Sequence, residues 1–127
     1  MKRTILPLLT ALLVSCGTSQ FVQKGVMDGV EVAYRWNHPA GKPSELLLKL
    51  KNTDTEDRRI HMIVDLYYQG RTVETLIADT CIRSGQTLNG KLNGIYFRPE
   101  QLTTEQIKSG DAQAEVTKTE VSTGSCE

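Results

Sequence analysis

Hydrophobic and polar residues alternate along most of the chain after residue 29, with the two-residue period of β-strands. In VEVAYRWN, residues 30–37, the side chains of Val30, Val32, Tyr34 and Trp36 share one face, and polar or small residues occupy the other. The stretch HPAGKPS then interrupts the pattern, because its two prolines lack a backbone donor. We therefore expect a half-buried strand over residues 30–37.

Two longer alternating runs follow, ELLLKLK at residues 45–51 and RIHMIVDLYY at residues 59–68. Every second residue of these runs is apolar or aromatic: Leu46, Leu48, Leu50, Ile60, Met62, Val64, Leu66 and Tyr68. The polar stretch NTDTEDR connects them. Together the two runs and their connection predict a hairpin.

The pattern is weaker between residues 71 and 97. RTVETLIAD predicts a strand with Val73, Thr75 and Ile77 on one face, and Ser84-Gly85 predicts a turn before a strand that carries Leu88 and Leu92. Asn89-Gly90 and Asn93-Gly94 both suit hairpin turns, but only one can form a turn without breaking the strand. The alternative for Gly90 is a bulge or a close approach of two segments.

The last third of the chain predicts a short helix and a final strand. Thr103 and Gln106 have the spacing of a capping box, and Gly110 suits a helix exit. Residues 112–121 resume the strand pattern. Strands at this spacing, with no long amphipathic helix, predict an all-β antiparallel β-sandwich of about seven strands with one short helical insertion, and a small barrel is the alternative.

Residues 46–97 resemble the small immunoglobulin-like domains of bacterial envelope proteins, including the FxLYD type. The similar positions are Asn52, Leu66, Tyr67, Gly70 and Gly85. The chain departs from that pattern at Gln69, in lacking Asp after Tyr68, and in an insertion over residues 99–110. The resemblance implies an immunoglobulin-like fold, but such folds serve many functions.

The N-terminus has the features of an export signal. Lys2 and Arg3 precede the apolar stretch ILPLLTALLV, which is much shorter than the roughly 20 residues that cross a bilayer as a helix. The sequence LVSC at residues 13–16 resembles the lipobox of bacterial lipoproteins, in which the cysteine thiol is acylated and the chain is cut before it. The alternative is an incidental cysteine beside an ordinary cleavage site. We expect a signal peptide at residues 1–15, a tether at 16–27 and the sandwich domain at 28–127.

The lipobox resemblance implies where the protein lies. Acyl chains such as palmitate on Cys16 would anchor it to a membrane of the cell envelope. The residue directly after Cys16 is Gly17 and not Asp, and in this the sequence resembles lipoproteins that are passed on to an outer membrane. We therefore expect lipid anchoring, with the outer membrane as the expected location.

Two cysteines remain besides Cys16. In an exported protein an even number of cysteines favours pairing, so Cys81 and Cys126 are predicted to form a disulfide that closes a loop of about 45 residues. The alternatives are two free thiols or a reactive or metal-binding pair. No C-x-x-C motif is present, and neither histidine is near either cysteine in sequence.

Charge and motifs argue against several functions. Removal of residues 1–15 takes away Lys2 and Arg3 and leaves thirteen basic and fifteen acidic residues. This slightly negative net charge argues against a nucleic-acid binder. His38 and His61 belong to no hydrolase motif, and we predict no metal site, no cofactor and no enzymatic activity. Ile63 and Tyr67, on the polar face of their strand, are candidates for protein contact.

Two functions follow as hypotheses. The first is a membrane-anchored, non-enzymatic envelope lipoprotein that binds or supports another envelope protein through a sheet face or an edge strand. The alternative is a small ligand-binding or hydrolytic domain with a cleft near residues 99–110, in which His38, Asp79 or Glu105 would meet a perturbed neighbour.

Overall fold

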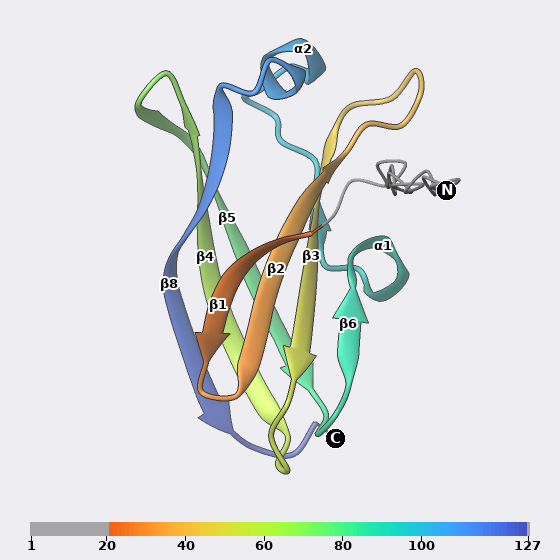
Figure 1. Cartoon of the computed structure of the whole chain (residues 1–127), viewed down its shortest axis with the longest axis vertical. Coiled ribbons are helices and arrows are strands. Elements are labelled where there is room, and N and C mark those ends of the chain that lie inside the picture. Colours follow the sequence, from red (N-terminus) through yellow and green to blue (C-terminus); the bar gives the residue numbers. More distant parts are fainter. Residues whose placement is uncertain (1–20, 127) are drawn as a thin grey trace, which may run out of the picture.

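The computed structural model describes residues 21–126, which form a β-sandwich of two antiparallel sheets with two short helices (Figure 1). Sheet A contains β1 (Val22–Met27), β2 (Val30–Asn37), β3 (Glu45–Asn52) and β6 (Thr87–Asn89) in that order, and β7 (Tyr96–Phe97) also pairs with β3. Sheet B has the order β5 (Arg71–Ile82), β4 (Arg58–Tyr68), β8 (Ala112–Thr123). The helices are α1 (Gly90–Asn93) and α2 (Thr104–Lys108). The all-β fold predicted from the alternation is confirmed.

The core lies between the two sheets and is built from the alternating positions. The predicted inward faces of β3 and β4 are buried as expected, and Tyr34, Trp36 and Tyr68 pack against the edge of the core. The residues that are at most 2% exposed include Val30, Leu46, Leu48, Leu50, Ile60, Met62, Val64, Leu66 and Ile82. Burial of these side chains is the main force that holds the sheets together.

The predicted hairpin between residues 45–51 and 59–68 is wrong, because these two strands belong to different sheets. Both sides of β3 are occupied, by β2 on one side and by β6 and β7 on the other, while β4 lies between β5 and β8. The polar connection therefore crosses from one sheet to the other. Asn52, fully buried at the end of β3, fixes this crossing with its side chain.

The predicted face of β5 is correct at one end and wrong at the other. Val73 packs against the core, but Ile77 is 55% exposed, and the buried positions are Leu76 and Ala78. The reason is a break in register between Leu66 and Tyr67 of β4, where one extra residue in β5 shifts the alternation. A bulge of this kind reverses the inward and outward faces beyond it.

The strand predicted to contain Leu88 and Leu92 ends at Asn89, and α1 follows. Leu88 is buried, whereas Leu92 is 85% exposed. Gly90 is the close approach that the sequence allowed, since a Cβ there would lie 2.9 Å from the Cβ of Leu47. Gly94 has the positive φ of 73° that ends the helix in the left-handed region. Asn93-Gly94 thus closes a helical turn in place of a hairpin.

The predicted helix over residues 103–110 is confirmed as α2. Thr103 and Gln106 form the capping box in both directions: the Gln106 N–H donates to the Thr103 hydroxyl at 3.2 Å, and the Thr103 N–H donates to the Gln106 side chain at 2.9 Å. Ile107 points into the core. Residues 21–126 thus contain one more strand and one more helix than the sequence predicted.

The N-terminal part of the fold differs from the expected division. Residues 22–27, expected within the tether, form β1 and pair with β2 around a bulge between Gln23 and Gly25. Their weak periodicity hid the strand, since the bulge interrupts the alternation. The expected signal peptide, Cys16 and the tether up to residue 20 lie outside the described residues. Within residues 21–126, no helix is both long enough and apolar enough to cross a membrane.

Candidate functional site: the outer face of sheet B

The outward side chains of β4 form the centre of a three-strand surface, the outer face of sheet B. Alternation with the buried residues of β4 places five side chains on this face: Arg59, His61, Ile63, Asp65 and Tyr67. The neighbouring strands continue each row, with β5 on one side and β8 on the other. The two predicted contact residues, Ile63 and Tyr67, therefore share one surface.

An apolar pair lies at the centre of this surface. Ile63 of β4 is directly opposite Ile77 of β5, and Lys118 of β8 lies on the other side of Ile63. Ile77 is 55% exposed and Ile63 is half-buried. Sequence reasoning missed Ile77 because its alternation was counted from Val73, across the bulge. The sequence does contain a signal for an outward Ile77, because its two neighbours, Leu76 and Ala78, are also apolar and are the ones that are buried.

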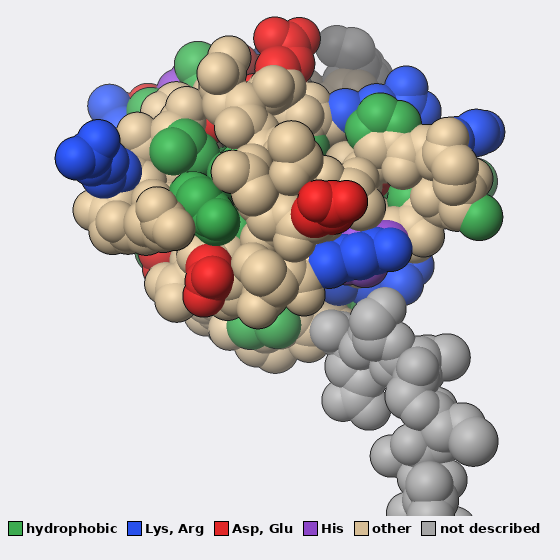
Figure 2. All heavy atoms as spheres, turned by 90° about the horizontal axis from the view of Figure 1, so that it is seen from above, with side chains coloured by type: hydrophobic (Ala, Val, Ile, Leu, Met, Phe, Trp, Pro, Cys, Tyr) green, Lys and Arg blue, Asp and Glu red, His purple; other side chains and the backbone are tan. Residues whose placement is uncertain are grey.

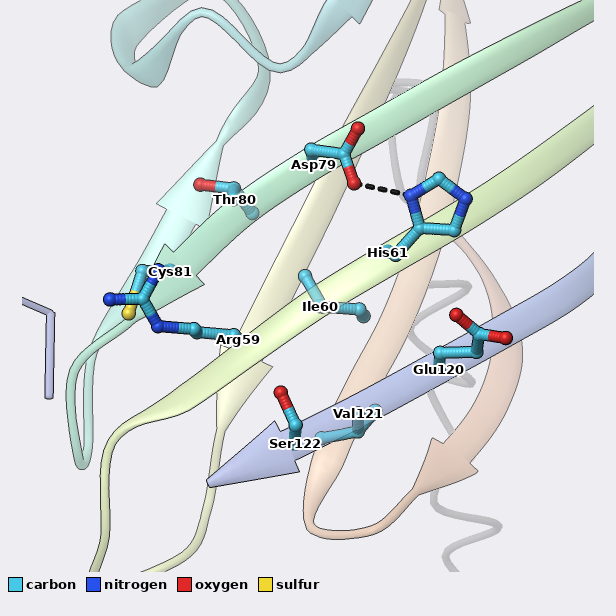
Figure 3. Close-up of a pocket in the computed structure, with 9 residues that line it drawn as sticks. All are labelled: Arg59, Ile60, His61, Asp79, Thr80, Cys81, Glu120, Val121 and Ser122. Carbon is cyan, nitrogen blue, oxygen red and sulfur yellow. Dashed lines mark hydrogen bonds and ion pairs between the residues drawn. The ribbon is translucent and has the colours of Figure 1, made fainter. Parts of the chain in front are cut away.

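A shallow hollow of about 480 Å³ lies beside the apolar pair, toward the lower end of sheet B (Figure 3). It is lined by residues from all three strands: Arg59, Ile60, His61, Asp79, Thr80, Cys81, Glu120, Val121 and Ser122. In Figure 3 the side chain of Asp79 points toward the ring of His61, with which it forms a hydrogen bond. Glu120 comes from the strand on the other side of His61.

The hollow brings together charged and hydrogen-bonding groups from the three strands. His61 Nδ1 is occupied by Asp79. Ser122 lies opposite Arg59, two residues along β8 from Glu120, which is the residue opposite His61. A serine hydrolase needs the hydroxyl within hydrogen-bond reach of the imidazole. Within residues 21–126, no group of three or more His, Cys, Asp or Glu side chains is arranged to hold a metal ion.

The predicted disulfide is confirmed and borders this hollow. Cys81, at the end of β5, is bonded to Cys126, and their Cα atoms are 5.5 Å apart. Two hydrogen bonds hold the same C-terminal segment: the Cys126 N–H donates to Asp57 at 3.1 Å, and Arg59 Nη2 donates to the Ser125 carbonyl at 3.0 Å. The C-terminus is thus fixed against the lower end of sheet B, where the hollow lies.

A second hollow, of about 760 Å³, lies at the other end of the sandwich, between the loop of residues 38–43 and α2. Its wall includes His38, Lys42 and Lys108, and Figure 2, which looks onto this end, shows a histidine partly covered by basic side chains. Burial, and next the positive charge of Lys108, lower the pKa of His38, so its imidazole is uncharged at neutral pH. His38 Nδ1 shares a hydrogen bond of 2.7 Å with the hydroxyl of Ser44, which is 2% exposed.

The structure does not bring together the residues expected in a cleft near residues 99–110. His38 lines the hollow beside α2, Glu105 is exposed on α2 outside the lining, and Asp79 lies in the other hollow with His61. Ser44 is the partner of His38 that the sequence did not indicate, because five residues, two of them prolines, lie between the two along the chain.

Comparison with known proteins gives no assignment. No family model, no curated protein and no solved structure matches this chain. The resemblances to lipoproteins and to immunoglobulin-like domains remain predictions, and function has to be argued from the surfaces of the domain.

Proposed function

We propose that this chain is an envelope lipoprotein, anchored through acyl chains on Cys16, whose domain binds or supports another envelope protein without catalysis. The observation that carries this proposal is the cross-strand apolar pair of half-buried Ile63 and exposed Ile77 on the outer face of sheet B. Exposed apolar side chains at the centre of a polar rim are the usual anatomy of a protein-binding surface.

The surroundings of the pair fit that anatomy. Lys118 and Tyr67 lie on the same face, with the hollow beyond His61 supplying charged groups of both signs. Such groups orient a partner and exclude wrong ones more than they add affinity. β5 also has strand β4 as its neighbour on one side and forms an edge of sheet B, so a partner strand could add to it.

The binding surface is tested with a photo-crosslinking amino acid at position 77 in native cells. We expect a reproducible protein adduct from position 77 and a different product, or none, from position 92, which is 85% exposed on sheet A's side of the domain. Ile63→Asp should weaken capture by a crosslinker at Thr75 about thirtyfold, the equivalent of a hot spot of about 2 kcal/mol. The same adducts from positions 77 and 92 would contradict a specific surface.

Anchoring is tested separately. Mass spectrometry of the protein purified from its native membrane should show an N-terminal peptide that begins at Cys16 and carries acyl mass. Cys16→Ser should release the protein from the membrane fraction. An unmodified peptide that spans residues 13–18 in the mature protein would contradict the anchor, and the outer membrane is distinguished from the inner one by density separation of the two fractions.

The hollow beside α2 supports a second candidate function, the binding of a small anionic ligand. His38, Lys42 and Lys108 line it, together with prolines and Leu102, and no carboxylate is among its lining residues. Hydrolysis is a poor fit, because the Ser44 hydroxyl beside His38 is buried away from any substrate. Titration with inorganic phosphate or citrate, followed by the NMR signals of the His38 ring, tests this candidate, and Lys108→Gln should abolish any response.

A further inference from the structure

The outer face of sheet A is basic. β2 and β3 pair in register, so the residues between the buried ones point outward together: Glu31 opposite Lys51, Ala33 opposite Lys49, Arg35 opposite Leu47, and Asn37 opposite Glu45. Of the inward positions between them, Val32 is 3% and Leu48 is 1% exposed. The alternation therefore fixes which charges share the surface.

The segment from α1 to β7 extends this basic face. Lys91 and Arg98 lie 6.0 and 5.6 Å from the centre of the Tyr96 ring, and both reach the buried carboxylate of Glu45, at 2.8 and 3.6 Å. Gly90 packs against outward-facing Leu47, which places α1 on this face. Leu92, next to Lys91, is 85% exposed. An exposed leucine beside cationic and aromatic side chains is typical of segments that lie in a membrane interface.

The two outer faces of the sandwich have opposite charge. In the described part of the chain, five basic and two acidic side chains belong to the outer face of sheet A: Arg35, Lys49, Lys51, Lys91, Arg98, Glu31 and Glu45. The strand residues that point outward from sheet B include two basic and four acidic ones: Arg59, Lys118, Asp65, Asp79, Glu115 and Glu120. The near-neutral total charge conceals this asymmetry, which can orient a protein at a charged surface.

The N-terminal chain reaches the domain on the basic face. The ring of Phe21 lies 5.2 Å from the guanidinium carbon of Arg35 and 5.5 Å from Lys49 Nζ. Cys16 precedes Phe21 by five residues, and five residues span at most about 18 Å when fully extended. An acyl anchor at Cys16 would therefore hold this face within about two Debye lengths of the bilayer at physiological salt.

We propose that the outer face of sheet A docks onto an anionic phospholipid surface, with its lysines and arginines at the headgroup phosphates and Leu92 in the interface. This inference rests on the proposed function only for the anchor at Cys16. Docking in this direction turns the outer face of sheet B, with Ile63 and Ile77, away from the membrane. The domain would then present its partner surface at a fixed orientation.

The test measures binding of the purified full chain, carrying Cys16→Ser, to vesicles of phosphatidylcholine with and without phosphatidylglycerol. The sheet A variant, Lys49→Gln with Lys51→Gln, should bind the anionic vesicles about 25-fold more weakly than the parent, at about 1 kcal/mol per lysine. The control variant, Arg71→Gln with Lys118→Gln, removes the same charge from sheet B and should bind like the parent. Residues 1–20 are identical in all variants, so any contribution they make cancels in the comparison.

Two further measurements test the contributions of Leu92 and of charge to vesicle binding. Leu92→Gln should weaken binding to anionic vesicles about tenfold, because a leucine side chain is no longer transferred out of water. Higher salt should weaken binding of the parent more than that of the sheet A variant. Equal binding by the sheet A variant and the control variant, or no preference for anionic vesicles, would overturn the proposal. An acidic protein would then be the alternative partner of this face.

The vesicle assay contains no acyl chain at residue 16 and no protein partner. Its failure would leave the acylation of Cys16 and the crosslinks from position 77 unaffected. Failure of those two experiments would equally leave the vesicle result standing. Circular dichroism and the urea midpoint of each variant check that the outward substitutions have not unfolded the domain.

Discussion

The buried side chain of Asn52 donates a hydrogen bond of 3.0 Å to the carbonyl of Ile82, and so joins the last residue of β3 in one sheet to the last residue of β5 in the other. The same amide nitrogen donates to the carbonyl of Glu56 at 2.8 Å, and its oxygen accepts from the Asp54 N–H at 3.0 Å. One side chain therefore fixes both the crossing between the sheets and the start of the chain's path into β4. Buried amides with all their partners specify a single arrangement of this kind.

Asn52→Ala should lower the free energy of unfolding by about 2–4 kcal/mol, because the buried carbonyl of Ile82 and the Asp54 N–H lose their partner. Urea unfolding followed by circular dichroism measures the change. The control is Asn89→Ala, since Asn89 is exposed and its side chain makes no cap hydrogen bond at α1, and it should change stability by less than about 0.5 kcal/mol. Similar losses in both variants would contradict the role given to Asn52.

Gly90→Ala should destabilise the domain by about 1–3 kcal/mol. The added Cβ would lie 2.9 Å from the Cβ of Leu47, so α1 would have to move off the sheet. The same urea experiment measures this loss. Leu92→Ala, in the same helix but 85% exposed, is the matched control and should be nearly neutral. If Gly90→Ala unfolds at the wild-type midpoint, α1 does not pack on Leu47 as described.

The strands β2, β3 and β4 and the side chains that they bury could be predicted from the sequence, whereas a bulge reversed the face of β5 and hid β1. β2, β3 and β4 repeat apolar residues at every second position, and these residues are buried as expected. A single extra residue in β5 reversed the alternation before Ile77, and a bulge between Gln23 and Gly25 hid β1. Local alternation carries no information about such register breaks, because they are set by the partner strand.

The candidate site was predictable to the same extent. The face shared by Ile63 and Tyr67 follows from alternation within β4 alone. The pairing of Ile63 with Ile77, of His61 with Asp79 and of His38 with Ser44 depends on which strands and loops become neighbours. The opposite charges of the two outer faces have the same origin, since they appear only once the sheet order is known.

Removal of the disulfide should lower the free energy of unfolding by about 2–4 kcal/mol, because the bridge closes a loop between residues 45 positions apart. Cys81→Ser with Cys126→Ser tests this by urea unfolding. Amide exchange should quicken near residues 125 and 126 more than in β4, because only the hydrogen bonds from Arg59 and to Asp57 then hold this segment. The wild type in reducing agent is the control and should match the double variant, and a wild type unaffected by reductant would contradict a stabilising bridge.

Acid should destabilise the domain, in part through Asp57. Its carboxylate accepts hydrogen bonds from the backbone N–H groups of Ser84, at 3.0 Å, and Cys126, at 3.1 Å, and these bonds lower the pKa of Asp57 against the opposing effect of burial. A folded-state pKa below the unfolded value of about 3.9 means that the unfolded chain binds more protons as the pH falls. The stabilisation is therefore complete above about pH 5 and is lost as the pH falls through the folded pKa.

Asp57→Asn should make the unfolding free energy fall less steeply between pH 5 and pH 2.5 than it does in the wild type, as urea titrations at each pH would show. The lowered pKa of His38 adds a loss of stability that begins near pH 6.5, but it is common to every variant and cancels in the comparison. Asp28→Asn, an exposed carboxylate in the β1–β2 turn, is the control and should retain the wild-type slope. An unchanged slope in Asp57→Asn would show that the two N–H donors do not stabilise the ionised carboxylate, and the link between the β5–β6 turn and the C-terminus would need another explanation.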